Sequence, residues 1–370
     1  MHVAFDVRTI QAGYGGDRIY LENLIRHLDR LPEITAISLY TEPRLGDAIP
    51  LPEHGKVRRQ ALTASRGWLW TPLAVPRQLR RDAASIFHAP HLVPPFPPCP
   101  TVVTIHDAIQ LVFAEGDRTS PRARLDRTLR DLSARRAAAI ITDSEHSRGD
   151  IARLMRVPAE KIHVIPLAAA EHFTPGDRGQ ARARVREVVG VQPPYVLCVG
   201  WASPHKNVPR VLSAVAALRQ AGGRDVAVVV AGNSGQDTVE ELRAQFPGLD
   251  GRLYFTGWVS TPDLVALYRG AALLAFPSLY EGFGLPVLEA MACGTPVVTS
   301  STTSLPEVAG EAALMVDPTD DTALTEAVGR VLTDSALAAS LAERGLRRAA
   351  QFSWDRTARA TCAVYTKLLA

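Results

Sequence analysis

Two glutamates eight positions apart, Glu281 and Glu289, mark the stretch of this 370-residue chain with the clearest chemistry. An ionised carboxylate only accepts hydrogen bonds, and sugar hydroxyls are obvious donors to it. Either glutamate alone would be read as a solvated surface residue, since most acidic side chains are exposed. Gly282 and Gly284 lie between them and let the backbone approach a ligand closely. The pair with its glycines therefore favours a ligand that carries hydroxyl groups.

The elements around these glutamates predict an anion site. Residues 272–276 form an apolar run of strand length, Pro286 suits the first turn of a helix, and Gly294 suits its C-terminal cap. The start of that helix should leave free N–H groups at its positive end, where phosphate binds well. These groups are expected on Gly284, Leu285 and Val287. A ligand with both phosphate and sugar, such as a sugar nucleotide, fits this stretch.

A lysine follows another expected strand. Residues 195–199 are apolar, and Gly200 to Asn207 lead from them into a helix that contains Lys206 near its start. A lysine meets a diphosphate as a compact point charge. Lys206 alone would be an ordinary surface residue. Together with the helix start at Leu285, it predicts a second contact to the same anion.

The N-terminal half opens with a strand at 2–7, a glycine turn that includes Gly15 and Gly16, and a helix at 18–31. This order suits an open parallel sheet with a ligand at its carboxyl edge, or else a turn without a ligand. Arg18 at the helix start could also face the charge of a leaving diphosphate.

His106 follows an expected strand at 101–105. A histidine in that place either contacts a ligand, shuttles a proton, or packs and bonds locally. The residue type alone favours the local role, and His88 and His91 are weaker candidates still.

Length and pattern predict two α/β domains. Short apolar runs alternate with helical segments, as in parallel sheets. Further strands are expected at 36–40, 85–88, 138–142, 162–165, 226–231, 252–255, 297–299 and 313–316. Proline and glycine near 174–194 predict the connection, so we expect domains at 1–173 and 174–353 whose strand ends face one another across a deep cleft.

Composition excludes several classes of function. A net charge of +3 and the interleaved charges at 121–136 give little support to nucleic-acid binding, and this arginine-rich segment is expected to be a solvated helix face. The four dispersed cysteines have no metal-ligand spacing, and no signal peptide or membrane-spanning segment is found. We therefore expect a metal-free cytoplasmic protein.

The stretch from Trp68 to Arg81 combines two tryptophans and apolar residues with a basic end. Such a composition suits a membrane surface, at the inner face of the membrane, or a lipid-linked acceptor. The simpler interpretation, that the tryptophans pack under a loop, has more weight from the sequence alone.

Residues 281–289, Glu-Gly-Phe-Gly-Leu-Pro-Val-Leu-Glu, resemble the E-x7-E motif of retaining glycosyltransferases of family 4, which have the two-Rossmann GT-B fold. Matching segments cover nearly the whole chain, at 13–16, 104–107, 142–147, 161–166, 200–207 and 352–354. The resemblance implies that residues 354–370 cross back to the first domain. Residues 103–113 are most similar to the mannosyltransferase-like branch.

The resemblance also implies roles for individual residues. Glu281 would bind hydroxyls of the donor sugar and, with Lys206 and His106, form the catalytic set, with His106 beside the sugar C6 hydroxyl. Glu289 would bind the ribose. The remaining donor-binding positions would be Gly15, Gly16, Trp201, Asn207, Trp258, Val259, Gly282, Phe283, Gly284, Leu285 and Val287.

One residue departs from the family pattern. Many members have an arginine where Trp201 stands, so the diphosphate would meet one cation fewer unless Arg18 replaces it. The expected activity is transfer of a hexose, with GDP-mannose preferred as donor, to a hydroxyl of a glycan or lipid-linked acceptor, with retention and without a metal. A UDP- or dTDP-sugar donor, or a sugar-nucleotide-binding subunit with weak turnover, is the alternative.

Overall fold

The computed structural model describes residues 1–8, 10, 15–43, 55–63, 69–90, 92–113, 121–200, 203–233 and 235–370, with the backbone alone at 121–123, 126 and 236–238. These residues form two compact units. Unit 1 contains Met1–Leu167 and Ser353–Ala370, and unit 2 contains Ala168–Phe352. The chain thus enters unit 2 a few residues before the expected position 174, and its last segment belongs to unit 1.

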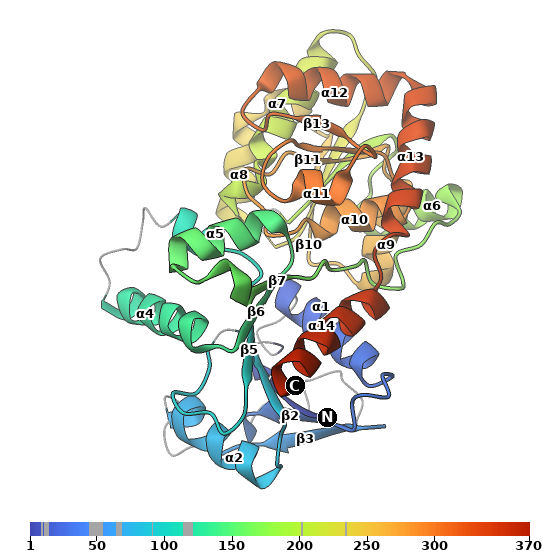
Figure 1. Ribbon diagram of the computed structural model, residues 1–370. Coiled ribbons are helices and arrows are strands. Elements are labelled where there is room, and N and C mark those ends of the chain that lie inside the picture. Colours follow the sequence, from blue (N-terminus) through green and yellow to red (C-terminus); the bar gives the residue numbers. More distant parts are fainter. Residues whose placement is uncertain are drawn as a thin grey trace. The chain divides into compact units, whose positions relative to one another are not determined.

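Unit 1 is built on a parallel sheet whose strands follow the spatial order β3, β2, β1, β4, β5, β6, β7 (Figure 1). The strands are β1 (His2–Asp6), β2 (Ala36–Thr41), β3 (Val57–Ala61), β4 (Ile86–Ala89), β5 (Thr101–Thr104), β6 (Ala139–Thr142) and β7 (Ile162–Val164). The order reverses its direction between β1 and β4. Ligands of open parallel sheets bind at such a reversal, outside the carboxyl ends of the strands.

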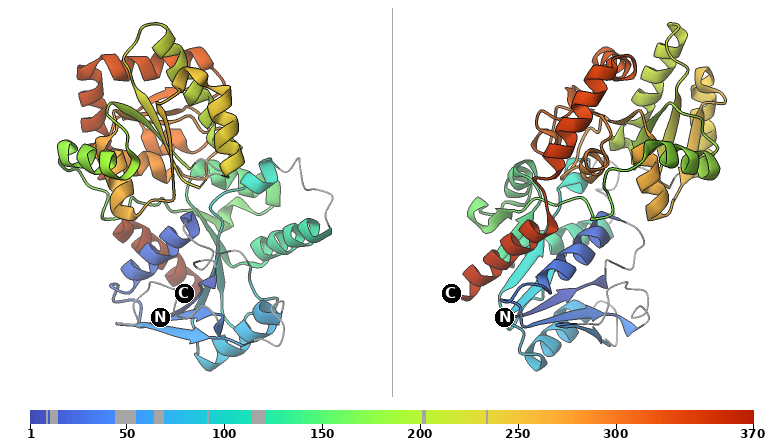
Figure 2. Two further views of the ribbon diagram at one scale, coloured as in Figure 1. Left: turned by 180° about the vertical axis from the view of Figure 1, so that it is seen from behind. Right: turned by 90° about the vertical axis from the view of Figure 1, so that its right-hand side faces the viewer.

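The helices of unit 1 connect these strands. They are α1 (Gly16–Leu28), the π-helical turn η4 (Trp70–Ala74), α2 (Val75–Arg81), α3 (Ile109–Val112), α4 (Pro121–Arg136), α5 (Glu145–Met155), the short turn η5 (Ala159–Lys161) and the C-terminal α14 (Trp354–Leu369). Helices α1 and α14 pack against each other, and α4 lies on the opposite side of β5 and β6 from them (Figures 1 and 2).

Unit 2 repeats the theme with a parallel sheet in the order β10, β9, β8, β11, β12, β13. Its strands are β8 (Tyr195–Val199), β9 (Ala227–Ala231), β10 (Leu253–Gly257), β11 (Leu273–Phe276), β12 (Val297–Ser300) and β13 (Leu314–Val316). Here the order reverses between β8 and β11. These are the two strands that precede Lys206 and Glu281.

The helices of unit 2 cover both faces of this sheet. They are α6 (Arg178–Val189), η6 (Pro204–Lys206), α7 (Val208–Gln220), α8 (Gln236–Gln245), η7 (Pro247–Leu249), α9 (Thr261–Gly270), α10 (Leu285–Ala292), α11 (Leu305–Ala309), α12 (Asp321–Thr333) and α13 (Ser335–Ala349). All residues of the inner strand β9 (Ala-Val-Val-Val-Ala) are buried, as expected for a parallel strand covered on both faces.

The last helix, α14, completes unit 1 through a few buried contacts. Tyr365 Oη lies 2.5 Å from Nδ1 of His88 on β4. The hydroxyl of Thr357 donates to the carbonyl of Pro166 at 2.7 Å. Trp354 is buried at the start of the helix and approaches the ring of Tyr20 on α1. The sequence-based expectation of two Rossmann-like α/β domains is confirmed.

Candidate functional site

The residues with the strongest sequence signal gather where the sheet of unit 2 reverses direction. Lys206 follows β8, and Glu281 follows β11, the neighbouring strand. Because carboxyl ends of adjacent parallel strands share one edge of the sheet, the two loops meet although 75 positions separate the residues. The structure therefore brings the predicted cation and carboxylate together.

Their side chains form an ion pair. Lys206 Nζ lies 2.7 Å from Glu281 Oε1, and both side chains are largely buried. Lys206 Nζ also lies 4.9 Å from the centre of the Phe276 ring. Gly200, with φ of 85°, leaves room for the lysine, since a Cβ there would lie 3.2 Å from Lys206 Cε. The pair offers one positive and one negative group to a ligand at the same point.

Helix α10 begins beside this pair as the sequence predicts. Gly284 precedes it with φ of 117° and no side-chain cap, and a Cβ there would lie 2.6 Å from Leu305 Cδ2. Both observations require glycine at this position. Pro286 is in the first turn, and Gly294 follows the helix in a left-handed conformation. The expected strand, turn and helix are confirmed.

The expectation of a free N–H group on Val287 is wrong. The Val287 N–H group donates to the carbonyl of Gly284 at 3.0 Å, so it is not free. This bond closes the first turn of α10. Within the described part of the chain, the N–H groups of Gly284 and Leu285 have no backbone acceptor. The start of α10 therefore leaves two of the three predicted backbone N–H groups for an anion.

Neighbouring polar residues hold the loop that carries Glu281. The Ser304 hydroxyl lies 2.9 Å from the Glu281 carbonyl and 2.8 Å from that of Phe283, and Thr303 Oγ1 accepts from the Glu281 N–H at 3.3 Å. The Asn207 side chain is buried and donates to the carbonyls of Pro277 and Pro318. Asn207 thus fixes the loop, and its predicted contact with the donor stays a prediction.

Glu289 has a different environment from Glu281. It is buried on α10, and its Oε2 accepts from the Tyr268 hydroxyl at 2.7 Å. Burial raises the pKa of Glu289 to about 7, although the bond from Tyr268 opposes this rise. One of its two oxygens is therefore already engaged by the protein. Its predicted role at the ribose stays a prediction.

The other predicted donor contacts in unit 2 lie at the same edge or outside the described residues. Trp258 and Val259 follow β10, and the Trp258 ring is 60% exposed. Phe283 is buried and packs edge-on against Phe352. Gly282 is buried in the turn. Trp201, which stands where many family members have an arginine, lies outside the described residues.

In unit 1, the candidate histidine is held in an acidic environment. His106 follows β5, and its Nδ1 lies 2.7 Å from Oδ2 of the buried Asp143, which follows β6. Its Nε2 lies 3.6 Å from Asp17 at the start of α1. The ring stands edge-on to Tyr20 with centres 4.7 Å apart. Three elements therefore fix the plane of the imidazole.

These neighbours decide the charge of His106. Burial alone would lower the pKa of its ring, but Asp143, Asp17 and Asp107 raise it to about 9. Burial raises the pKa of Asp143, and His106 opposes that rise. The pair therefore retains a proton at neutral pH, and Nδ1 of His106 donates to the carboxylate.

Asp143 is the functional candidate that the sequence analysis missed. It lies within the segment 142–147 that carries part of the family resemblance, but its pairing with His106 spans 37 positions. The pairing could have been inferred from the sheet, because β5 and β6 are neighbouring strands. His106 follows the end of β5 by two positions, and Asp143 directly follows β6.

The glycine turn of unit 1 leads into α1. Gly15 and Gly16 are exposed, and no atom would contact a Cβ added to either one. Arg18 donates from Nε to Glu22 one turn later at 2.6 Å, so its charge is partly offset. The predicted phosphate contacts of Gly16 and Arg18 stay predictions.

The described residues show neither a metal-binding cluster nor a membrane-spanning helix. No group of three His, Cys, Asp or Glu residues in the described ranges is placed to hold a metal ion. A metal-free reaction stays a prediction. None of the described helices is both long enough and apolar enough to cross a membrane.

Comparison with known proteins identifies both halves of the chain. Residues 14–169 match the family "Glycosyltransferase Family 4", and residues 180–348 match "Glycosyl transferases group 1". The chain is 31% identical over 384 residues to O-antigen chain mannosyltransferase B of Escherichia coli, and this alignment covers 100% of both chains. It is 31% identical over 276 residues to the serotype-specific mannosyltransferase WbdA of Escherichia coli, with 74% of this chain and 34% of WbdA covered.

The solved structures agree with this assignment at the level of the fold. Sucrose-phosphate synthase from Thermosynechococcus elongatus superimposes with a TM-score of 0.79 over 100% of this chain and 99% of its own, at 21% identity. The two parallel sheets are therefore those of a GT-B fold. With the two family models and a 31% identical relative that matches over the full length of both chains, this chain belongs to family 4 of the glycosyltransferases.

Proposed function

We propose that this glycosyltransferase moves mannose from GDP-mannose to a hydroxyl of a glycan or lipid-linked acceptor, with retention of configuration. The Lys206–Glu281 pair beside the start of α10 carries the proposal. It joins a cation for phosphate to an acceptor of sugar hydroxyl bonds, as a sugar nucleotide requires. The relatives named mannosyltransferases support mannose as the transferred sugar.

In this proposal the charge of the departing diphosphate is met by Lys206 and the N–H groups at the start of α10. Glu281 accepts hydrogen bonds from the sugar hydroxyls. The new bond from the acceptor oxygen to the anomeric carbon forms on the face from which the phosphate oxygen leaves. The proton of the acceptor hydroxyl passes to that phosphate oxygen, so no protein base is required, as the family resemblance implies.

His106 is proposed as a hydrogen-bond donor and positive charge beside the sugar. Because its pKa is about 9, the ring is protonated at neutral pH and does not act as a base. Its Nδ1 is occupied by Asp143, which leaves Nε2 as the group available to a substrate once Asp17 gives way. That His106 and the Lys206–Glu281 pair act on one donor is part of the proposal.

The choice of donor is tested by thermal unfolding with nucleotide sugars. A ligand that binds the native state raises the unfolding temperature. GDP and GDP-mannose should raise it more than the UDP or dTDP compounds do. If UDP- or dTDP-sugars give the larger shift, the mannose donor is refuted, although the transferase assignment stands.

The catalytic pair is tested by replacing its carboxylate. Glu281→Ala should lose most turnover, by about 100-fold or more, because it removes the contact to the reacting sugar. Glu326→Ala is the matched control, since Glu326 is an exposed glutamate on α12 of the same unit. Circular dichroism should show both variants folded. Turnover of Glu281→Ala at the wild-type rate would refute the proposed site.

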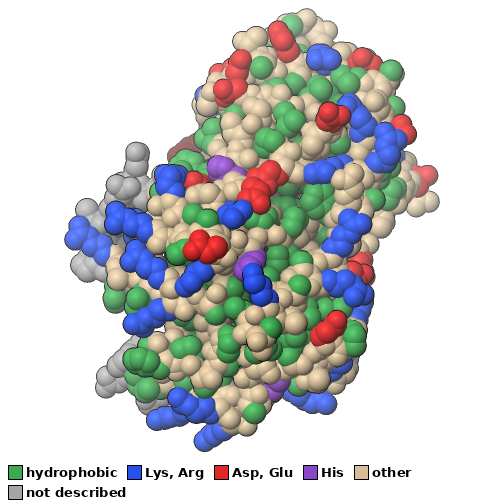
Figure 3. All heavy atoms as spheres, viewed as in Figure 1, with side chains coloured by type: hydrophobic (Ala, Val, Ile, Leu, Met, Phe, Trp, Pro, Cys, Tyr) green, Lys and Arg blue, Asp and Glu red, His purple; other side chains and the backbone are tan. Residues whose placement is uncertain are grey.

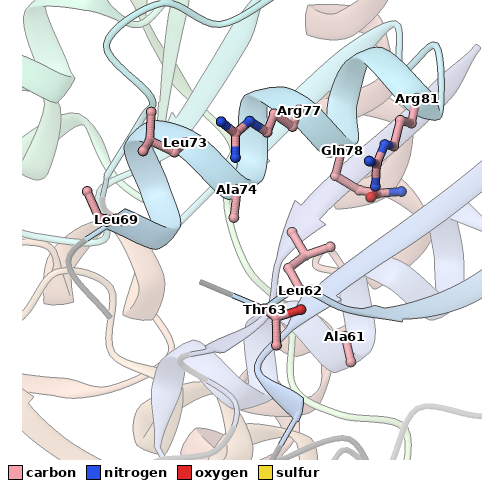
Figure 4. Close-up of a pocket in the computed structure, with 9 residues that line it drawn as sticks. All are labelled: Ala61, Leu62, Thr63, Leu69, Leu73, Ala74, Arg77, Gln78 and Arg81. Atoms are coloured by element: carbon pink, nitrogen blue, oxygen red, sulfur yellow. The ribbon is translucent and has the colours of Figure 1, made fainter. Parts of the chain in front are cut away.

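The stretch from Trp68 to Arg81 was predicted to contact a membrane or a lipid-linked acceptor. Trp68 lies outside the described residues, and Trp70 is buried under Arg8, whose guanidinium lies 3.7 Å from the ring centre. A pocket of about 400 Å³ between α2 and the end of β3 is lined by six residues of the stretch: Leu69, Leu73, Ala74, Arg77, Gln78 and Arg81 (Figure 4). A concave site supports the acceptor over a flat membrane.

The lining of this pocket is amphiphilic. Leu62, Leu69 and Leu73 supply apolar surface, while Arg77 and Arg81 bring two guanidinium groups from α2 (Figure 4). This combination suits a ligand with an anionic group and an apolar part, such as a lipid phosphate. We therefore place the proposed acceptor contact here. Arg77→Gln with Arg81→Gln should raise the KM for a lipid-linked acceptor and leave thermal shifts by donor nucleotides unchanged.

A further inference from the structure

A row of four polar side chains runs through the core of unit 1 and ends beside His106. The hydroxyl of Tyr365 on α14 lies 2.5 Å from Nδ1 of His88, and Nε2 of His88 lies 2.6 Å from Oγ1 of Thr104. The same Oγ1 lies 2.9 Å from the hydroxyl of Tyr20 on α1. Each of the four residues is at most 1% exposed. This polar row joins helices α1 and α14 through strands β4 and β5.

The polar row lies in the core rather than at the surface. Charged side chains are scattered over the face of the molecule shown in Figure 3, where water solvates them. A polar group in the core has to find its partners within the protein, and losing one of them is costly. Residues 3–5 of the adjacent strand β1 bury apolar side chains instead. Because the members of the row bond to one another, few other arrangements satisfy them, and the row fixes the positions of its ends.

His88 takes part in the polar row as a neutral ring. Burial, together with the positive charge of His106, lowers the pKa of His88 to about 3. A neutral imidazole has one donor and one acceptor nitrogen, and each flanking hydroxyl can take either role. Burial also raises the pKa of the Tyr20 hydroxyl and that of Tyr365, so both keep their protons. The row is therefore uncharged at neutral pH, in contrast to the imidazole of His106.

Tyr20 connects the polar row to His106. Its ring stands edge-on to the imidazole, with centres 4.7 Å apart and an angle of 84° between the planes. The far end of the Tyr20 side chain is held by Thr104, two positions before His106 in the chain. Trp354 on α14 also approaches the Tyr20 ring, with 6.4 Å between the ring centres. The ring against the imidazole is therefore itself held in place.

We propose that Tyr20 is a positioning residue for His106 and that the polar row holds the Tyr20 ring in place. Asp143 holds the imidazole at Nδ1, and Tyr20 limits how far the ring tilts about that bond. Together they keep Nε2 in one direction, as a group that meets a substrate requires. The inference rests on the proposed function, in which His106 donates a hydrogen bond beside the sugar. It gives Tyr365 of the last helix an indirect part in the site.

The pKa of His106 reports the position of its ring. Burial alone would lower this pKa, whereas Asp143, Asp17 and Asp107 raise it to about 9. His88 on the neighbouring strand β4 is neutral and adds no charge. An imidazole that tilts lies farther from the carboxylate of Asp143. Its pKa should then fall toward the usual value of about 6.5.

Tyr20→Phe is the main test, since it removes the hydroxyl and keeps the size of the buried ring. NMR titration of the full-length chain should show a lower pKa of His106 than in the wild type. Hydrolysis of GDP-mannose without an acceptor should slow by roughly tenfold, while the thermal shift given by GDP, which has no sugar, should be unchanged. Tyr40→Phe is the matched control, because Tyr40 is equally buried in unit 1 and its hydroxyl donates to Asp82. It should leave both the pKa and the hydrolysis rate at their wild-type values.

Thr104 offers a second pair of variants, which tests the row without changing the ring of Tyr20. Thr104→Val keeps the shape of the side chain and removes the hydroxyl that joins Tyr20 to His88. It should lower the pKa of His106, whereas Thr104→Ser keeps the hydroxyl and should titrate as the wild type does. Circular dichroism checks that each variant is folded. Equal titration curves for the valine and serine variants would overturn the inference, because the hydroxyl would then have no effect on His106.

A double-mutant cycle separates positioning from general support of the fold. In a His106→Ala background, Tyr20→Phe should slow GDP-mannose hydrolysis no further, because the group that Tyr20 positions is already absent. The same fold-loss in both backgrounds would overturn the inference. Wild-type turnover by His106→Ala alone would instead refute the proposed role of His106. The NMR titration requires no donor, so an unchanged pKa of His106 in Tyr20→Phe would refute the positioning role independently.

Discussion

At the scale of single residues, the acidic side chains around His106 keep its ring positively charged into the alkaline pH range. The folded pKa of about 9 lies above the usual value near 6.5, so the imidazolium is favoured in the native state. The stability that this charge contributes is fully present below pH 6.5 and is lost as the pH rises through 9. Any step that needs the charged ring follows the same upper limit.

Asp143→Asn tests this arrangement. Without the carboxylate, the pKa of His106 should fall from about 9 toward its usual value, because the largest interaction that raises it is removed. The alkaline limit of donor turnover should move down with it. NMR titration of the His106 ring measures the pKa directly. An unchanged titration in the variant would contradict the proposed pairing.

Tyr268→Phe tests the state of Glu289. The tyrosine hydroxyl stabilises the carboxylate, so its loss should raise the pKa of Glu289 above about 7 by roughly one unit. More of the residue is then neutral at pH 7, and nucleotide affinity should be weaker there and recover at higher pH. Tyr254→Phe is the control, because Tyr254 lies on β10 and its hydroxyl donates to the Gly251 carbonyl. Equal pH dependence in both variants would exclude a role for Glu289 in binding.

At the scale of elements, the start of α10 depends on one glycine. An alanine at 284 would take a left-handed conformation and press against the buried Leu305. We expect Gly284→Ala to destabilise the protein by about 1–3 kcal/mol, measured by denaturant unfolding. Gly222→Ala is the control, with φ of 76° and open space around the added methyl. If both variants lose the same stability, contact with Leu305 contributes nothing.

Much of the element pattern could be predicted because buried parallel strands are apolar runs. Strand β3 escaped prediction because it lies at the sheet edge and its residues, Val-Arg-Arg-Gln-Ala, are mostly polar. The exposure of Leu125, Leu129 and Leu132 on α4 was not predicted either. Its sequence shows where leucines recur, but which helix face meets the sheet is decided by packing against distant residues such as Val93.

The site could be predicted where its parts are local in sequence. The segment 281–289 specifies its own turn and helix start, and proline with glycine at known places signals both. The Val287 bond to Gly284 was missed because it depends on the exact turn geometry. The His106–Asp143 and Tyr268–Glu289 pairs were missed because each joins residues from different elements.

At the scale of the whole molecule, the chain ends by returning to the unit in which it began. Tyr365 on α14 bonds His88 in the core of unit 1, while Tyr195 of unit 2 donates to the Leu267 carbonyl. Tyr365→Phe should lower the stability of unit 1, and Tyr195→Phe that of unit 2, each by about 1–3 kcal/mol. Intrinsic-fluorescence and calorimetric unfolding should show different transitions shifted. One common shift would indicate a single cooperative unit.

The Lys206–Glu281 ion pair affects which molecules can bind at this site. An inorganic phosphate that attracts Lys206 must separate Glu281 from its counterion, and a lone carboxylate in a largely buried place is costly. A simple sugar that attracts Glu281 leaves the ammonium group unmatched in the same way. A molecule that carries both phosphate and sugar satisfies both partners at once, so the pair favours the whole donor over inorganic phosphate or a simple sugar.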